Sequence, residues 1–120
     1  MTQTAAEASD PLTVRRLSLP DLPQVVPIER RSFSDPWSLA MFGLEISKPS
    51  GISLAALRGE RLVGYLVCSR YADVWHVMNV AVDPEVRRRG IGTALMEALF
   101  ERADRPGAGR ATTTTIARTP

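Results

Sequence analysis

The segment 80–96 restricts the fold of this chain more than any other part of its sequence. An apolar run ends at Val82, and Asp83-Pro84 stops it because proline donates no hydrogen bond to a sheet. A basic loop, a glycine pair and an amphipathic stretch then follow in that order. The pattern predicts a strand, a tight turn and a helix over 90–102.

The turn carries the groups that a phosphate needs. The first amides of a helix have no carbonyl partner within the helix and lie at its positive dipole end. Gly90 and Gly92 let a ligand approach the backbone without a Cβ in the way. The guanidinium groups of Arg87, Arg88 and Arg89 suit phosphate oxygens. A Walker loop would need a lysine after the glycines, and a dinucleotide-binding loop would need a third glycine, so neither nucleotide fold is supported.

The remaining pattern predicts alternating strands and helices. We expect strands over 12–19, 52–57, 62–68 and 74–82, and helices over 22–31 and 39–47. The two middle strands are separated by a turn-forming tetrapeptide and form an antiparallel hairpin. Asp21 and Ser38 are candidate N-caps, and Pro27 should bend or interrupt the first helix. The stretch 111–116 is either a short edge strand or a disordered tail, because it has β-branched residues but almost no apolar face.

Composition limits the class of protein. The 120 residues are 44% hydrophobic, which suffices for the core of one domain. The start at 1–11 is polar and no apolar run approaches the about 18 residues of a membrane span, so we expect a soluble, cytoplasmic protein without a membrane partner. Cys68 is the sole cysteine, which excludes an internal disulfide, and its apolar surroundings predict a small buried hydrophobe. No metal site is predicted.

The run Arg-x-x-Gly-x-Gly at 87–92, preceded by Val-Asp-Pro, resembles the acetyl-CoA pyrophosphate loop of GNAT acetyltransferases. The resemblance implies an α/β (α+β) fold with a mixed, mostly antiparallel sheet flanked by helices. It spans Val14 to about Arg105 and implies a partial domain over 12–106, between a polar tail at 1–11 and a divergent tail at 107–120. It also implies that backbone groups near the loop hold the pyrophosphate and the pantetheine arm. The coenzyme-binding residues predicted in this way are Val80, Ala81, Val82, Arg87, Arg88, Arg89, Gly90, Ile91, Gly92 and Thr93.

A second segment is similar to one subgroup of that family. The Phe-x-x-Pro-Trp stretch at 33–37 and the run 79–84 resemble the RimI-type ribosomal-protein-alanine N-acetyltransferases, in which the loop borders the acceptor groove. The resemblance implies acetylation of a protein N-terminal amine, typically the alanine of a small-subunit ribosomal protein. Phe33, Pro36 and Trp37 are expected to form an apolar rim for the peptide, although Phe33 and Trp37 are equally well interpreted as core anchors. Glu29 or Asp35 would attract the cationic amine.

The sequence departs from the family pattern after the coenzyme helix. The resemblance places a catalytic carboxylate on the following strand and a catalytic tyrosine on the next helix, and the stretch 110–120 contains neither. We therefore expect the C-terminal strands and helix to be missing, through truncation, a shifted reading frame or degeneration. Tyr65, Tyr71 and His76 are the residues that would replace the missing pair, although a structural role is favoured for each. Catalytic residues stay unassigned, and His76 is the first to mutate because its ordinary pKa, about 6.5, suits proton transfer.

Three functions are compared on this basis. The first is an acetyl-CoA-dependent N-acetyltransferase, and the second is a non-catalytic acyl-CoA-binding or protein-binding remnant. A nucleic-acid-binding module is disfavoured because no aromatic platform or broad basic face accompanies the arginines at 87–89. Loss of the C-terminal strands would expose a sheet edge, which predicts a homodimer or marginal solubility.

Overall fold

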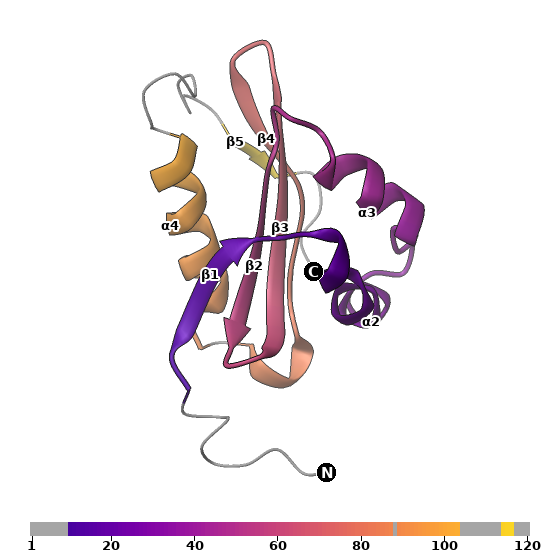
Figure 1. Ribbon diagram of the computed structural model, residues 1–120, viewed down its shortest axis with the longest axis vertical. Coiled ribbons are helices and arrows are strands. Elements are labelled where there is room, and N and C mark those ends of the chain that lie inside the picture. The colour runs from indigo at the N-terminus through magenta and orange to yellow at the C-terminus, as the bar shows by residue number, and fades with distance from the viewer. Residues whose placement is uncertain (1–9, 88, 104–113, 117–120) are drawn as a thin grey trace.

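Five strands form a single sheet between two layers of helices (Figure 1). The structure is a computed structural model that describes residues 10–87, 89–103 and 114–116. The strands are β1 (Leu12–Arg16), β2 (Ile52–Arg58), β3 (Arg61–Tyr71), β4 (Val74–Val82) and β5 (Thr114–Ile116). The helices are α2 (Leu22–Ser32), α3 (Leu39–Ile46) and α4 (Ile91–Ala103), with 3-10 turns η1 (Leu19–Asp21) and η2 (Pro84–Val86). No helix in these ranges is long and apolar enough to cross a membrane.

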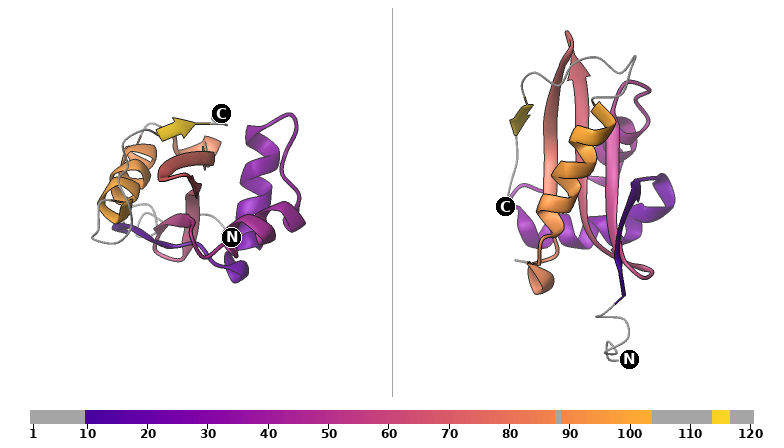
Figure 2. Two further views of the ribbon diagram at one scale, coloured as in Figure 1. Left: turned by 90° about the horizontal axis from the view of Figure 1, so that it is seen from above. Right: turned by 90° about the vertical axis from the view of Figure 1, so that its left-hand side faces the viewer.

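The two helical layers cover opposite faces of the sheet (Figure 2). Helix α4 packs on one face, where Ile91, Leu95 and Leu99 meet side chains of β2 and β3. Helices α2 and α3 pack on the other face around Phe42 and Tyr65. Both faces of β3 are covered, which explains why its residues from Leu62 to Ser69 are all buried. Cys68 is 1% exposed, as predicted, and this burial raises the pKa of its thiol to about 12.

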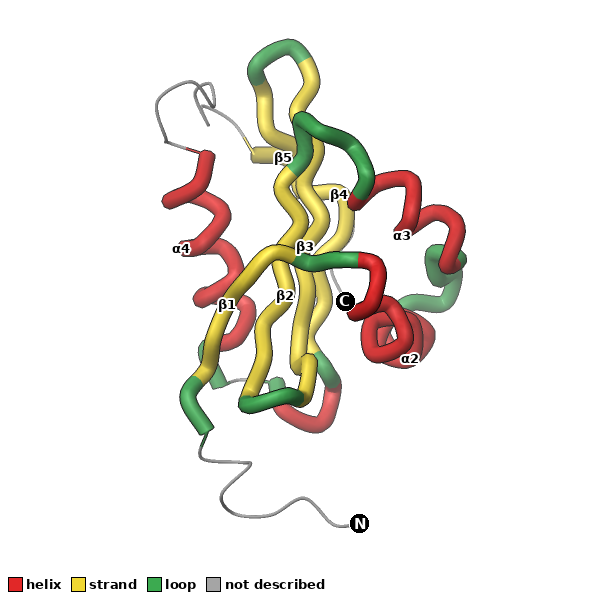
Figure 3. Tube along the Cα trace, in the orientation of Figure 1, coloured by secondary structure: helices red, strands yellow, loops and turns green. Residues whose placement is uncertain are grey.

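Neighbouring strands follow one another along the chain, and the first four are antiparallel (Figure 3). Strand β5 instead runs parallel to β4, with Trp75 opposite Thr114 and Val77 opposite Ile116. The edge-strand interpretation of the threonine-rich stretch is therefore confirmed for Thr114–Ile116, and positions 111–113 lie outside the described residues. Backbone pairing with β4 gives this stretch a strand conformation although its sequence has almost no apolar face.

Strand β4 contains a bulge. Asn79 pairs with Val67 and Val77 pairs with Cys68, so Met78 has no opposite residue on β3. The extra residue changes which side chains face each layer. Asn79 and Ala81 face α2, whereas Trp75 and Val77 pack on the α4 side.

Several predicted details of the elements are corrected. The first strand ends at Arg16, because the chain then turns into η1. Pro27 does not interrupt α2, which is continuous from Leu22 to Ser32. Asp21 does not cap that helix, and its carboxylate accepts hydrogen bonds from Arg15 Nη1 and Nη2 at 2.8 Å each. This ion pair holds the pKa of the Asp21 carboxyl below its ordinary value. Ser38 is confirmed as an N-cap, since its hydroxyl accepts from the Met41 amide at 3.2 Å.

Candidate coenzyme and acceptor sites

A groove lies between the end of β4 and the first turn of α4. Its volume is about 330 Å³. The residues that line it are Val80, Ala81, Val82, Arg87, Gly90, Ile91, Gly92 and Thr93. All eight belong to the predicted coenzyme set. Of the other two, Arg89 is exposed just before α4, and Arg88 lies outside the described residues.

The groove is open to the backbone at the start of α4. The amide of Ala94 donates to the Gly90 carbonyl at 3.0 Å, so the amides of residues 91–93 precede the first bond of the helix. Gly90 has a φ of 77°, a conformation that favours glycine. A Cβ added at Gly92 would lie 3.9 Å from Val82 Cγ2, which is ordinary van der Waals contact. Glycine at this position therefore leaves space in the groove and is not required by packing.

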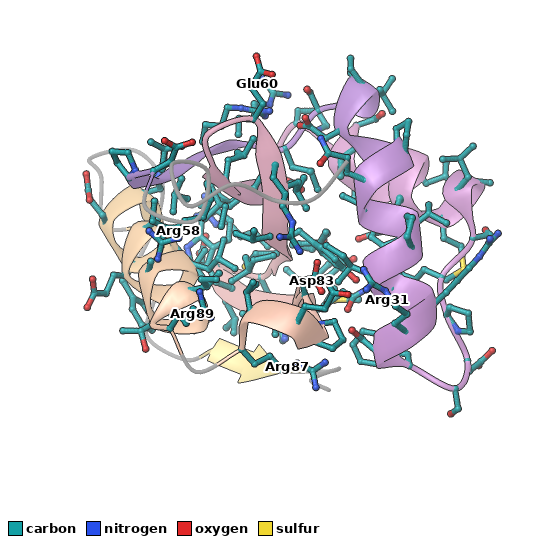
Figure 4. The ribbon with its side chains drawn as sticks, turned by 90° about the horizontal axis from the view of Figure 1, so that it is seen from below. Arg31, Arg58, Glu60, Asp83, Arg87 and Arg89 are labelled. Atoms are coloured by element: carbon teal, nitrogen blue, oxygen red, sulfur yellow. The ribbon has the colours of Figure 1, made fainter. Side chains whose placement is uncertain are left out.

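A buried aspartate fixes the turn between β4 and α4. Asp83 is 4% exposed, and its amide donates to the Val63 carbonyl at 2.8 Å. Its carboxylate lies 3.1 Å from Arg61 Nη2 and 3.5 Å from Arg31 Nη1, and the labelled Arg31 and Asp83 lie close together in Figure 4. The same carboxylate accepts from the Glu85 amide at 3.0 Å. The Asp-Pro stop predicted from the sequence is thus also an ionic anchor between the sheet, α2 and the basic turn.

Arg87 reaches from the basic turn toward α2. Its Nε donates to the Val82 carbonyl at 3.2 Å and its Nη2 to Ser32 Oγ at 3.4 Å. Figure 4 shows Arg87 on the turn and Arg89 beside the start of α4. The exposed guanidinium groups and the helix terminus together give the groove the donors and positive charge that suit a pyrophosphate.

The predicted acceptor loop lines a separate pocket of about 370 Å³. Phe33, Ser34, Asp35, Pro36, Trp37 and Met41 form its wall. The Trp37 ring packs edge-on against Phe42 with centroids 5.3 Å apart, and both Phe33 and Trp37 contact the core beneath. These two residues therefore combine the alternatives left open by the sequence, because each anchors the loop and also lines the pocket. Asp35 is exposed on the rim.

Glu29 lies beneath that loop and not on its surface. Its side chain is fully buried and accepts hydrogen bonds from Tyr65 Oη at 2.6 Å, Asn79 Nδ2 at 2.8 Å and the Trp37 amide at 2.8 Å. Direct contact with an acceptor amine, which the sequence suggested for Glu29, is inconsistent with this burial. The prediction is corrected because the carboxylate is enclosed by its own donors.

The three candidate replacements for a catalytic pair differ in position. Tyr65 is fully buried and its hydroxyl is bonded to Glu29, so it contacts neither groove. Tyr71 is 48% exposed and its hydroxyl accepts from Lys48 Nζ at 3.2 Å. The ring of His76 lies against the Tyr71 ring, with centroids 5.6 Å apart. His76 is half-buried and is the imidazole that remains available for a mutational test.

Sequence reasoning assigned no site role to Asn79 or Arg61. An amide in the middle of the apolar strand β4 needs a polar partner when it is buried, and this was the available signal for Asn79. Glu29 carried a similar signal, because it follows Val25 by four residues and so falls on the apolar face of α2. Arg61 offered none, since a hairpin arginine is ordinarily exposed.

Comparison with known proteins places the chain in a family. A model of the acetyltransferase (GNAT) family matches residues 22–119. The chain is 32% identical over 96 residues to the ribosomal protein bS18-alanine N-acetyltransferase of Salmonella typhimurium, covering 79% of this chain and 64% of the relative. It is 32% identical over 99 residues to N-alpha-acetyltransferase RimI of Mycobacterium tuberculosis, covering 78% and 63%. The chain thus spans less than two thirds of the length of either relative.

Solved structures agree with the fold. The ribosomal-protein-S18-alanine N-acetyltransferase of Escherichia coli superposes with a TM-score of 0.70 at 27% identity, covering 77% of this chain and 59% of that one. The PaiA N-acetyltransferase of Thermoplasma acidophilum, solved with coenzyme A, gives a TM-score of 0.70 at 18% identity over 77% and 71% of the two chains. The family model includes both the β4–α4 groove and the acceptor loop, and this chain belongs to the GNAT acetyltransferase family.

Proposed function

We propose that this chain is an acetyl-CoA-dependent N-acetyltransferase of protein N-terminal amines, of the ribosomal-protein-alanine type. The observation that carries the proposal is the groove between β4 and the first turn of α4, whose lining coincides with the predicted coenzyme set. The second pocket, lined by the loop at 33–37, supports a peptide acceptor. The bS18-alanine acetyltransferases among its relatives support alanine as the acceptor residue.

The reaction brings together the acceptor amine from one site and the acetyl thioester from the other. The neutral amine nitrogen of the acceptor attacks the thioester carbonyl carbon, an amide bond forms, the carbon–sulfur bond breaks, and the thiolate of coenzyme A takes up the proton that the amine loses. The amides at the start of α4 and the guanidinium of Arg87 hold the pyrophosphate, and the backbone of residues 80–82 orients the pantetheine arm. An N-terminal amine, with a pKa of about 8, offers a larger neutral fraction at neutral pH than a lysine, with a pKa of about 10.4.

A non-catalytic acyl-CoA-binding or protein-binding protein is the second candidate. It is favoured by the burial of Glu29 and Tyr65, because two groups suited to proton transfer are bonded to each other inside the protein. Coenzyme binding is expected of the transferase and of an acyl-CoA-binding protein, and turnover separates these two.

The test uses the purified full chain, acetyl-CoA and a peptide that begins with alanine. Coenzyme affinity is measured by calorimetry and thiol release by a chromogenic disulfide, with the same peptide blocked by an N-terminal acetyl group as the matched control. Binding with release only from the unblocked peptide supports the transferase. Coenzyme binding without thiol release supports the second candidate. If the unchanged chain releases thiol and His76→Ala does not, the imidazole has a proton-transfer role. Absence of coenzyme binding would refute the transferase and an acyl-CoA-binding protein, and would leave only a protein-binding role.

Two further expectations stay predictions. A homodimer through the sheet edge is predicted, because β5 pairs only with Trp75–Val77 and, in the described part of the chain, the rest of β4 has no strand on that side. Sedimentation of the purified chain tests it. A cytoplasmic site of action is expected from a ribosomal-protein acceptor, and cell fractionation tests that expectation.

A further inference from the structure

Glu29 joins three parts of the fold that are distant in sequence. It lies on α2, and its carboxylate accepts hydrogen bonds from the side chains of Tyr65 on β3 and Asn79 on β4. It also accepts a hydrogen bond from the backbone amide of Trp37, which belongs to the acceptor loop. The side chain has no exposed surface, so this carboxylate works only through the groups that it holds.

The donors are divided between the two carboxylate oxygens. Oε1 accepts from Tyr65 Oη at 2.6 Å and from Asn79 Nδ2 at 2.8 Å, both of which belong to the sheet. Oε2 accepts from the Trp37 amide at 2.8 Å. Hydrogen bonds to an ionised acceptor are short and strong, and a buried carboxylate that lost them would be costly. Oε1 therefore faces the sheet, and Oε2 holds the loop.

The loop has ring contacts that support the same placement. Trp37 packs on Phe42 with centroids 5.3 Å apart, and Phe42 packs on Tyr65 at 5.7 Å. Asn79 immediately precedes residues 80–82, which line the coenzyme groove. Through Asn79 and Trp37, one carboxylate connects the backbone of the coenzyme groove to the wall of the acceptor pocket.

We infer that Glu29 is a positioning residue that sets the acceptor pocket relative to the coenzyme groove, by fixing the Trp37 backbone to β3 and β4. The inference rests on the proposed function for the identity of the acceptor. It assigns Glu29 no contact with either substrate. It predicts that the two halves of the carboxylate have separable effects, one on acceptor binding and one on the stability of the sheet contact.

Two substitutions separate the halves. Glu29→Gln keeps the shape of the side chain but replaces one acceptor oxygen by an NH₂ group. While the carbonyl oxygen faces the two sheet donors, this NH₂ group cannot accept the hydrogen bond from the Trp37 amide. Tyr65→Phe removes one sheet donor and leaves the Trp37 bond in place. Glu45→Gln is the matched control, because Glu45 lies on the neighbouring helix and accepts from Ser69 Oγ at 2.9 Å without contacting the loop.

The measurements are amide exchange of Trp37 by NMR and affinity for a labelled alanine-first peptide in saturating coenzyme A. We expect Glu29→Gln to accelerate amide exchange of Trp37 at least tenfold and to weaken peptide binding at least tenfold. Coenzyme affinity should change less than twofold. The Phe42 amide, which donates to the Ser38 carbonyl at 3.1 Å, should remain protected and shows that α3 is intact. Tyr65→Phe and Glu45→Gln should leave peptide affinity within about threefold, a pattern that a merely destabilising role would not produce.

The outcomes distinguish this inference from the proposed function. If the unchanged chain binds the peptide and Glu29→Gln binds it equally, or keeps Trp37 protected, the positioning role is wrong and the proposed function stands. Equal losses in Glu29→Gln and Tyr65→Phe would also overturn the role, because both would then act through stability. If the unchanged chain binds coenzyme A but no alanine-first peptide, the acceptor assignment and this inference fall together.

Discussion

Gly92→Asp should weaken coenzyme binding by about 100-fold or more without weakening the fold. The glycine lies in the first turn of α4 and lines the groove, and a Cβ there would meet only Val82 Cγ2 at 3.9 Å. A carboxylate near the N-terminus of a helix is stabilising by about 0.3–1 kcal/mol. Stability and coenzyme affinity should therefore change in opposite directions.

The loss of affinity follows from charge. The introduced carboxylate would lie near the pyrophosphate. At a separation of about 6 Å and an effective dielectric constant of about 40, the repulsion between the carboxylate and each unit of phosphate charge is about 1.4 kcal/mol. Two phosphate charges give about 2.8 kcal/mol, which corresponds to an affinity about 100-fold weaker. The volume that the side chain fills in the groove adds to this loss.

Calorimetric titration with acetyl-CoA and urea unfolding of the same samples test both halves. Gly92→Ala separates volume from charge, and Gly43→Asp is the remote control, since a Cβ at Gly43 meets nothing within 4 Å. We expect Gly92→Ala and Gly43→Asp to retain most of the affinity. Unchanged affinity in a folded Gly92→Asp variant would refute the placement of the pyrophosphate at this helix terminus.

Three further predictions concern the body of the fold. Phe42→Ala should lower the free energy of unfolding in urea by about 3–5 kcal/mol, because Phe42 is fully buried between Trp37 and Tyr65; a loss below about 1 kcal/mol would contradict that packing. Arg15 lowers the pKa of Asp21, so the ion pair stabilises the protein above the ordinary carboxyl pKa and this contribution is lost as the pH falls through the folded-state pKa. Asp21→Asn should therefore make the free energy of unfolding depend less steeply on pH below about pH 4. An unchanged dependence on pH in this range would argue against the ion pair. Burial raises the pKa of Cys68 to about 12, so a thiol reagent at neutral pH should modify the chain only in denaturant, and rapid labelling of the native protein would show that the thiol is accessible.

The groove between β4 and α4 was predictable because its information is local. A glycine pair, the preceding arginines and the Asp-Pro stop lie within ten consecutive positions, 83–92, and each acts through backbone geometry or charge in its own turn. The amphipathic pattern of α4 likewise follows from residues within one helix, and Leu95 and Leu99 are buried as their spacing indicates.

The carboxylate network was not predictable from local patterns. Glu29 meets Tyr65 across 36 positions and Asn79 across 50, so no window around Glu29 contains its partners. A lone glutamate beside a basic pair is ordinarily an exposed residue. Strand β5 shows the same limit, because its threonines gain a strand conformation from pairing with β4 and not from an apolar face of their own.

The single extra residue at Met78 divides β4 into two stretches of opposite phase. Before it, odd-numbered side chains such as Val77 belong to the α4 layer, and after it odd-numbered side chains such as Ala81 belong to the α2 layer. Deletion of Met78 would therefore restore a regular ladder, in which Val77 and Asn79 stay opposite Cys68 and Val67 on their present faces. If β4 instead kept all nine residues without a bulge, strict alternation would place Asn79 on the same face as Val77, toward α4 and away from Glu29, so the bulge decides whether the carboxylate network can form.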